Sequence, residues 1–238
     1  MLDISAVRAI SLDLDDTLWP VWPTIARAEL ALQGWLALRA PGAAAMVADS
    51  QARAALRQQV IDTRPDLHHD LSHQRQELIR LALHQCGEDT SHAPAAFEVF
   101  FAERNRVDFY DDALPALAQL AERYPVLAVS NGNADVARVG VGHLFAGSVS
   151  ARDAGVAKPD GRIFAAAASR LCLAPEQVLH VGDDPALDVL GALGAGMQAV
   201  WVNRDGKSWA HEAQPHATVT HLGELCALLA GAASLRVT

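Results

Sequence analysis

Three aspartates fall within four positions near the start of the chain, at the end of an apolar run. The segment reads Asp13-Leu14-Asp15-Asp16-Thr17-Leu18 and overlaps the end of the apolar run 7–14. Two carboxylates ~4 Å apart repel by about 4 kcal/mol at an effective dielectric constant of about 20, and a bound cation reverses the sign of that cost. Carboxylate oxygens are hard ligands that suit Mg²⁺. The segment therefore predicts either a magnesium site or an aspartate-rich turn that caps a helix.

A second acidic segment follows another apolar run, residues 178–181. It reads Gly182-Asp183-Asp184-Pro185-Ala186-Leu187-Asp188. Gly182 permits a tight turn, and Asp183 and Asp184 add carboxylates that could join the first group at one cation. Asp188 lies one helical turn beyond Asp184, where it could brace a ligand or a water molecule. A capped helix is the alternative, although two acidic segments at strand ends are hard to sustain without a cation.

Two further segments carry groups that bind phosphate in proteins. Ser130-Asn131-Gly132-Asn133 follows the apolar run 126–129 and offers a hydroxyl, backbone amides and a glycine that lets an anion approach closely. Ser and Asn also cap helices, so an ordinary cap is the alternative. In Lys158-Pro159-Asp160, the proline suits the first turn of a helix and holds Lys158 extended, which would aim its ammonium at a fixed point. Taken alone, Lys158 could equally be a solvated loop lysine.

The apolar runs supply a scaffold that would bring these segments together. Each run is short enough for a buried strand, and helical patterns lie between the later ones. The runs are 7–14, 126–129, 178–181 and 199–202, and the helical patterns are 113–123, 160–171 and 185–195. Strands alternating with helices predict an α/β fold, a Rossmann-like doubly wound parallel sheet covered on both faces. Ligands bind outside the carboxyl ends of such strands, where the polar segments lie.

The stretch between the first two strands breaks this alternation. It holds helix-like segments at 24–39, 43–61, 71–86 and 94–106, and no convincing strand. We expect a helical cap domain at residues 21–107, inserted into a core formed by residues 1–20 and 108–238. A short run at 217–220 and a helix at 222–229 predict an edge element at the end of that core.

Composition excludes several classes of protein. With 238 residues, of which 51% are hydrophobic, the chain can bury a core, so we do not expect disorder. A formal net charge of −9 argues against a nucleic-acid partner, because binding to phosphate backbones relies on clustered Lys and Arg. We expect no membrane partner, because no run approaches the length of a membrane span. The start of the chain lacks a signal-peptide pattern, and Cys86, Cys172 and Cys226 form no metal or disulfide pattern, so we expect reduced, buried cysteines in a cytoplasmic protein.

Taken in order, the four polar segments resemble the motifs of the haloacid dehalogenase superfamily, over residues 4–204. The family carries DxDxT after the first strand, a Ser or Thr after a later strand, a Lys, and an acidic motif. Here these are Asp13 to Thr17, Ser130, Lys158 and Asp183-Asp184. The insertion at 21–107 resembles the family's helical cap of the first type. Residues 130–134, 179–184 and 196–199, with residues 65–75, resemble the bacterial branch that dephosphorylates FMN and 5-amino-6-(5-phosphoribitylamino)uracil.

The resemblance implies a Mg²⁺-dependent phosphatase that acts on a small phosphorylated metabolite, as a monomer or a homodimer. It implies that Asp13 attacks phosphorus to form an aspartyl phosphate. Asp15 would protonate the leaving oxygen and then activate the hydrolytic water.

The resemblance also implies how the ligands are held. Mg²⁺ would be bound by the Asp13 carboxylate, the Asp15 backbone carbonyl and Asp183, with Asp184 and Asp188 in support. Ser130 and Lys158 would hold the transferring oxygens, and Thr17 would order the first loop. The expected substrate and phosphate contacts are Thr17, Trp19, Trp22, Asn131 and Gly132.

Trp19 and Trp22 follow the first motif, and polar side chains gather in the expected cap at His68, His69, Asp70, His73 and Arg75. One hypothesis is that they line a lid, with tryptophan stacked on a flavin or pyrimidine ring. The alternative is that the tryptophans belong to the packed interior and the histidines to a solvated face.

Three other functions remain open. A carbon–halogen hydrolase of the same superfamily lacks the second aspartate of the first motif, so Asp15 favours phosphate. A phosphosugar mutase keeps that aspartate. A catalytically silent phosphate-binding protein on the same fold would not need the complete set of motif residues.

Overall fold

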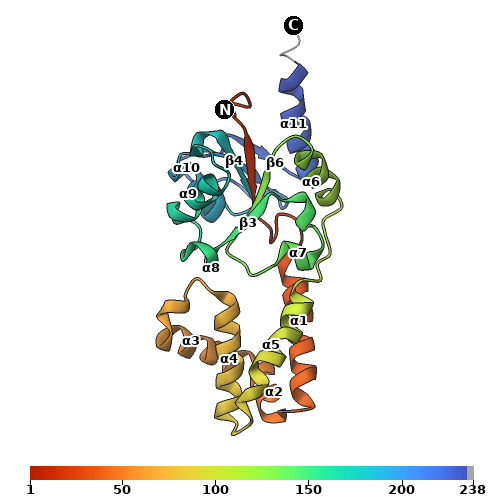
Figure 1. The fold of residues 1–238 in the computed structure, drawn as a ribbon, viewed down its shortest axis with the longest axis vertical. Coiled ribbons are helices and arrows are strands. Elements are labelled where there is room, and N and C mark those ends of the chain that lie inside the picture. Colours follow the sequence, from red (N-terminus) through yellow and green to blue (C-terminus); the bar gives the residue numbers. More distant parts are fainter. Residues whose placement is uncertain (235–238) are drawn as a thin grey trace. The chain divides into compact units, whose positions relative to one another are not determined.

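The computed structural model describes residues 1–234, which form two compact units. One consists of Met1–Pro20, Asp108–Gly132 and residues 140–234, and the other of Val21–Val107 and Asn133–Val139. We call them the core unit and the helical unit. Figure 1 shows the strands of the core unit and the helices of the helical unit. Each unit has its own hydrophobic core.

A six-stranded parallel sheet forms the centre of the core unit, in the order β3-β2-β1-β4-β5-β6. The strands are β1 (Ala9–Leu12), β2 (Val126–Ser130), β3 (Gly147–Ser150), β4 (Val178–Gly182), β5 (Gln198–Val202) and β6 (Ala217–Val219). Every residue of the four inner strands is buried, which explains their apolar sequences. The predicted doubly wound α/β fold is confirmed.

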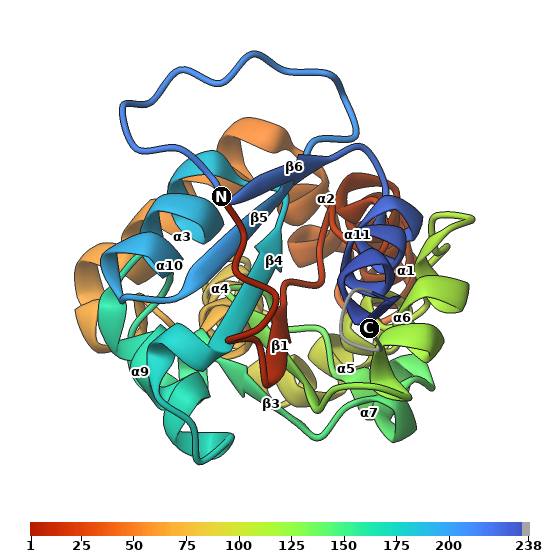
Figure 2. The ribbon, with the colours of Figure 1, turned by 90° about the horizontal axis from the view of Figure 1, so that it is seen from above.

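Helices cover both faces of this sheet. Figure 2 shows α9 and α10 on one side and α6 and α11 on the other. The bounds are α6 (Ala113–Ala121), α8 (Ala151–Ala154), α9 (Gly161–Arg170), α10 (Gly191–Gly194) and α11 (Leu222–Ser234), with a short π-helical turn at Pro185–Leu190. Ile163, Phe164 and Ala167 of α9 are fully buried in one core cluster with residues of β2, β4 and β5.

The helical unit buries alanine and leucine between its helices. These are α1 (Val21–Ala37), α2 (Pro41–Ala48), α3 (Ser50–Thr63), α4 (Leu71–Gln85), α5 (Ala93–Arg104) and α7 (Val136–Val139). The single helix expected at 43–61 is two helices. Asp49 separates them with extended backbone, and its side chain accepts a hydrogen bond from Ala52 N (2.6 Å), which caps α3.

Residues 133–139 were assigned to the core in the sequence-based prediction, and the structure groups them with the helical unit. Asp135 N donates to Asn105 Oδ1 (2.7 Å), and Arg138 pairs with Glu98 of α5. These contacts join two segments far apart in the chain, which sequence patterns do not reveal.

The three cysteines differ in exposure, although all are free. Cys226 is buried, Cys86 is half-buried and Cys172 is exposed, so the prediction of three buried cysteines was wrong. Cys172 follows α9 with left-handed backbone (φ 56°). Within residues 1–234, no helix is long and apolar enough to cross a membrane.

Candidate active site

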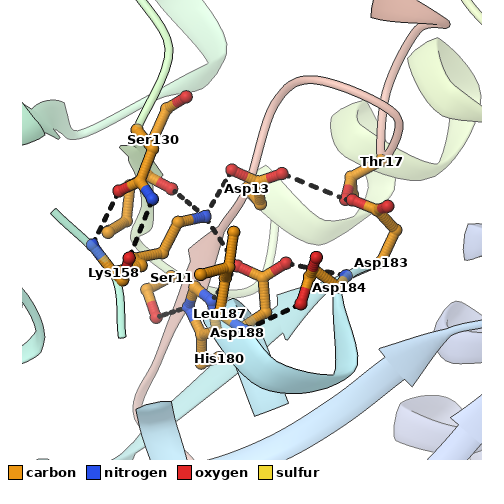
Figure 3. A network of polar contacts seen from close by, with 12 residues as sticks. Ser11, Asp13, Thr17, Ser130, Lys158, His180, Asp183, Asp184, Leu187 and Asp188 are labelled. Carbon is orange, nitrogen blue, oxygen red and sulfur yellow. Dashed lines mark hydrogen bonds and ion pairs between the residues drawn. The ribbon is translucent and has the colours of Figure 1, made fainter. Parts of the chain in front are cut away.

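The carboxyl ends of three neighbouring strands bring the polar segments together. Asp13 follows β1, Ser130 ends β2 and Asp183 follows β4, and β1 lies between the other two strands. The register pairs Leu12 with both Ala128 and Val181, so the three strands end at the same edge. Figure 3 shows these side chains pointing toward one another.

Lys158 lies at the centre of this group, and its three donors are all used. Its Nζ donates to Asp13 Oδ1 (2.5 Å), to Asp188 Oδ1 (2.6 Å) and to the Val129 carbonyl (3.1 Å). The side chain is 3% exposed. A fully hydrogen-bonded, buried ammonium is a fixed charge, unlike a solvated loop lysine.

The charges of the site shift the pKa values of its members. Burial raises the pKa of Asp13 well above its ordinary value, although Lys158 opposes the shift. Burial alone would lower the pKa of Lys158, but the carboxylates of Asp13 and Asp188 raise it above its ordinary range. Burial would likewise raise the pKa of Asp188, yet Lys158 and His180 hold it below its ordinary value. One ammonium therefore faces an excess of carboxylates.

A divalent cation fits this excess of negative charge. Asp13, Asp183 and Asp188 each offer a carboxylate oxygen, and the three oxygens lie within 4.8 Å of one another. Burial, with repulsion from Asp188 and Asp16, raises the pKa of Asp183 to about 7. Both oxygens of Asp188 already accept hydrogen bonds, from Lys158, His180 and the Asp184 backbone. Asp13 and Asp183 are thus the better-placed ligands, and their oxygens suit a hard cation.

Asp184 occupies a different role from the one expected. Its Oδ1 accepts hydrogen bonds from the backbone N–H groups of Ala186 and Leu187 (2.8 Å each), so it caps the turn Pro185–Leu190. The group of closely spaced carboxylates contains Asp188 instead. The turn between Asp184 and Asp188 brings the Asp188 carboxylate back to the end of β4. From the sequence, Asp188 was expected only to support the metal ligands.

The loop that follows β1, residues 13–19, is the first loop of the site, and it folds back on itself around Trp19. The indole Nε1 donates to Asp15 Oδ1 (2.9 Å), and Asp16 N donates to the Trp19 carbonyl (2.7 Å). Asp16 has left-handed backbone (φ 57°), which aspartate tolerates better than most residues. The Thr17 hydroxyl lies 3.2 Å from Asp183 Oδ1 and 3.5 Å from Asp13 Oδ2.

Trp19 corrects the stacking hypothesis. Its side chain is fully buried, and its ring lies edge-on to Phe109 with 5.3 Å between centroids. No face of the indole is open to a substrate, so Trp19 belongs to the packed interior, the alternative stated above. Its function in the site is to hold the Asp15 carboxylate.

The second loop is built around its own hydrogen bonds. Ser130 Oγ accepts from Gly132 N (2.9 Å). The Asn131 side chain accepts from Lys158 N (2.7 Å) and donates to the Lys158 carbonyl (2.9 Å), so it clamps that backbone from both sides. Asn131 was expected to cradle phosphate, and in the structure it positions Lys158.

Sequence reasoning missed two polar side chains that support the site. His180 lies in the middle of β4, fully buried, with Nδ1 2.8 Å from Ser11 Oγ and Nε2 3.1 Å from Asp188 Oδ1. Burial lowers the pKa of His180 below its ordinary value. Arg204 donates to both oxygens of Asp112 (2.8 and 3.0 Å) and to the Thr17 carbonyl (2.9 Å). The sequence signal that could have identified His180 was a histidine inside an apolar run. No pattern in the sequence marked Arg204.

The helical unit contains a cavity of about 610 Å³ between α1 and α3. Trp22, which is 75% exposed, lines it together with Glu29, Arg53 and Arg57. Glu29 Oε1 pairs with Arg75 (2.7 Å), whereas its buried Oε2 has no hydrogen-bond partner.

Two of the polar residues expected to line a lid, Asp70 and Arg75, have structural roles. Asp70 caps α4 by accepting from His73 N (3.0 Å), and the Arg75 guanidinium lies over the ring of Phe100, 4.3 Å from its centroid. These contacts account for Asp70 and Arg75 without a ligand.

Comparisons with known proteins find phosphatases and a dehalogenase among the proteins similar to this chain. The chain is 31% identical over 234 residues to the 5-amino-6-(5-phospho-D-ribitylamino)uracil phosphatase YigB of Escherichia coli, covering 95% of this chain and 98% of that protein. It is 36% identical over 157 residues to a phosphoserine phosphatase of Thermus thermophilus, covering 63% of each chain. A solved structure described as a 2-haloacid dehalogenase from Pseudomonas syringae superposes with a TM-score of 0.89 at 35% identity, covering 94% of this chain and 99% of that one.

The family profile described as haloacid dehalogenase-like hydrolase matches residues 7–196, which include every motif residue of the site. The chain belongs to the haloacid dehalogenase-like hydrolases.

Proposed function

We propose that this protein is a Mg²⁺-dependent phosphatase that hydrolyses a small phosphorylated metabolite. The observation that carries the proposal is Asp15, a half-buried carboxylate two residues after Asp13, held by the indole N–H of Trp19 at 2.9 Å. Loss of an alkoxide from phosphorus requires a proton, which such a group can supply, whereas a halide leaves without one. The phosphatases among its relatives support the same function.

Each group in the site has a role in this reaction. Asp13 attacks phosphorus, the bond to the leaving oxygen breaks, and Asp15 protonates that oxygen. Asp15 then takes a proton from water, which attacks the aspartyl phosphate and releases inorganic phosphate and free Asp13. The Lys158 ammonium, fixed between Asp13 and Asp188, places positive charge beside the transferring oxygens. Asp13 and Asp183 would hold Mg²⁺, with the Asp15 carbonyl as a further ligand, and the ion would neutralise charge on the phosphoryl group.

The substrate we propose is a phosphoester of a planar, polar ring, such as FMN or 5-amino-6-(5-phospho-D-ribitylamino)uracil. The Escherichia coli relative carries the second compound in its name and aligns over 98% of its length. In the helical unit, Trp22 has an exposed aromatic face of the kind on which a planar ring stacks. We propose that the protein is cytoplasmic, which is consistent with its three free cysteines. We also propose that it is a monomer or a homodimer.

Haloacid dehalogenation is the second candidate, because the Pseudomonas syringae structure has that description and matches at a TM-score of 0.89. The two reactions release different products. A purified sample should therefore be assayed for phosphate release from nucleotides, sugar phosphates, FMN and the uracil phosphoester, and for halide release from 2-haloacids, each with Mg²⁺ and with EDTA. Phosphate release that EDTA abolishes is the expected result, and halide release without phosphate release would overturn the proposal.

Two variants connect the activity to the site. Asp13→Asn should abolish turnover while the far-UV circular dichroism spectrum stays unchanged, because an amide is a poor nucleophile. Asp15→Asn should allow little turnover of ordinary phosphoesters and more of p-nitrophenyl phosphate, whose leaving group needs no proton. Asp160→Asn, which alters a carboxylate that is 37% exposed and paired with Arg162, is the control and should retain activity.

Trp22→Ala tests the ring preference. It should raise the KM for FMN and leave the KM for p-nitrophenyl phosphate unchanged. Leu38→Ala, which removes a comparably exposed apolar side chain outside the cavity, is the control. An unchanged KM for FMN in Trp22→Ala would exclude stacking on this residue.

A further inference from the structure

A chain of buried hydrogen bonds runs from the inside of the sheet to the candidate nucleophile. It passes from Ser11 to His180 (2.8 Å), from His180 to Asp188 (3.1 Å), from Asp188 to Lys158 (2.6 Å) and from Lys158 to Asp13 (2.5 Å). Ser11 and His180 are 0% exposed, and neither has a role in the reaction described above. Figure 3 shows the imidazole between Ser11 and Asp188.

The hydrogen-bond partners determine which ring nitrogen of His180 carries the proton. Asp188 Oδ1 also accepts a hydrogen bond from Lys158 Nζ, so the carboxylate is an ionised acceptor. The imidazole must therefore donate to it from Nε2. A neutral imidazole then has a lone pair on Nδ1, and the Ser11 hydroxyl donates to it. The contact from Ser11 thus selects the Nε2–H tautomer, the form that can hold Asp188.

The same three residue types form hydrolytic triads in other proteins, but this group cannot act as one. Ser11 lies within β1 and is fully buried, so no substrate can reach its hydroxyl. Its hydroxyl donates to His180 Nδ1 from inside the sheet. The arrangement orients the carboxylate and does not activate the serine.

Asp188 has little freedom once these bonds form. Its Oδ2 accepts from Asp184 N (3.0 Å), and its carboxylate lies so close to Gly182 that a Cβ there would be 2.3 Å from Asp188 Cγ. Oδ1 receives two donors, His180 and Lys158. Without the His180 donor, the carboxylate could rotate about its remaining contacts and Lys158 would lose its fixed position.

We propose that His180 is a positioning residue, which holds Asp188 through Nε2–H, in the tautomer selected by Ser11, so that Lys158 is fixed against Asp13. The proposal rests on the proposed function in that Lys158 acts on the transferring phosphoryl group. It assigns to a buried strand residue an effect on catalytic rate beyond its contribution to packing.

Two substitutions at His180 separate positioning from packing. His180→Leu fills the space without a donor, and His180→Gln places an amide N–H near the position of Nε2. We expect His180→Leu to lower kcat by about 10- to 100-fold, as loss of an orienting partner does at other sites, with KM changed by less than about threefold. His180→Gln should recover most of the loss. Both are assayed well below their melting temperatures, so that only folded protein is compared.

A packing role predicts another pattern. The two variants would then melt at lower temperatures than the wild type, and their kcat values would be equal to that of the wild type. Equal kcat values in His180→Leu and the wild type would overturn the proposal. If His180→Leu does not fold, Ser11→Ala replaces it, because it removes only the hydroxyl that selects the tautomer and should lower kcat by a smaller factor.

Nuclear magnetic resonance tests the tautomer without any substrate. Long-range ¹H–¹⁵N correlation on metal-free, ¹⁵N-histidine-labelled protein should show His180 as a neutral ring protonated at Nε2, and Ser11→Ala should populate the other tautomer. A ring protonated at Nδ1 in the wild type, or a doubly protonated ring, would overturn the proposal. This measurement stands even if phosphate release is not detected, so failure of the two proposals can be told apart.

Discussion

Asn131 holds the backbone of Lys158 through both ends of its amide. Its Oδ1 accepts from Lys158 N at 2.7 Å and its Nδ2 donates to the Lys158 carbonyl at 2.9 Å. The clamp joins the loop after β2 to the loop that carries Lys158. Because the Lys158 ammonium is 3% exposed and fixed by three bonds, a shift of its backbone moves a charge that water cannot replace.

Asn131→Ala should therefore reduce kcat by about tenfold or more, since small displacements of a positioned group cost that much. Asn131→Asp keeps the acceptor for Lys158 N and loses the donor to the carbonyl, so its kcat should fall between those of the wild type and Asn131→Ala. Steady-state kinetics with thermal unfolding as the folding check is the measurement. Wild-type kcat in Asn131→Ala would show that the clamp has no role in catalysis.

Gly182→Ala should be among the most damaging single changes in the core unit. An added Cβ would meet Asp188 Cγ at 2.3 Å and Oδ2 at 2.4 Å, so the carboxylate must leave its position beside Lys158. Overpacking of this kind costs about 1–3 kcal/mol of unfolding free energy, and the displaced carboxylate should also lower kcat. Both are measured by urea unfolding and phosphate release.

The control for Gly182→Ala is Gly194→Ala. Gly194 ends α10, and no atom outside its own helix lies within 4 Å of an added Cβ. This variant should keep wild-type kcat and stability within about 0.5 kcal/mol. If the two alanine variants behave alike, the close approach of Asp188 to Gly182 does not constrain the site.

Much of the fold follows from local sequence, and the exceptions have physical causes. Buried inner strands must be apolar on both faces, so β1, β2, β4 and β5 were visible as apolar runs. The edge strand β3 reads Gly-Ser-Val-Ser with only Val149 buried, and nothing in that pattern predicts a strand. The break between α2 and α3 depends on one capping aspartate, Asp49, within a continuous helical pattern.

The site could be predicted where topology alone brings residues together. Asp13 and Asp183 follow adjacent parallel strands, so their proximity follows from the sheet. The roles of Asp184 and Asp188 could not be separated, because which of them faces the strand end depends on how the turn Pro185–Leu190 winds. His180 was hidden because a histidine whose two nitrogens are both hydrogen-bonded can occupy an apolar strand.

Asp183 should make the stability of the metal-free protein depend on pH. Its pKa is raised from 3.8 to about 7, so between these values the folded chain holds a proton that the unfolded chain has released. The free energy of unfolding must then fall as pH rises from about 4 to about 7, by on the order of 4 kcal/mol for this group. Melting temperatures in EDTA at a series of pH values measure this trend.

Magnesium should reverse the loss, because it replaces the proton at Asp183. Added Mg²⁺ should raise the melting temperature strongly at pH 8 and little at pH 5, where the proton competes. Asp183→Asn removes this titrating group, so it should weaken the pH trend, to which the raised pKa of Asp13 also contributes, and flatten the response to Mg²⁺. Identical curves for Asp183→Asn and the wild type would show that Asp183 is not a ligand.

Arg204→Lys should loosen the first loop although charge is conserved. The guanidinium holds both oxygens of Asp112 and the Thr17 carbonyl, and it lies 4.0 Å from the ring centroid of Tyr110. An ammonium cannot form the planar fork, the carbonyl bond and the stacking contact together, so we expect a loss of about 1–3 kcal/mol of unfolding free energy and a lower kcat. Arg162→Lys alters a similar pair with Asp160 in which the arginine is 73% exposed, and it should change neither quantity measurably. Equal effects of the two substitutions would mean that the loop does not depend on Arg204.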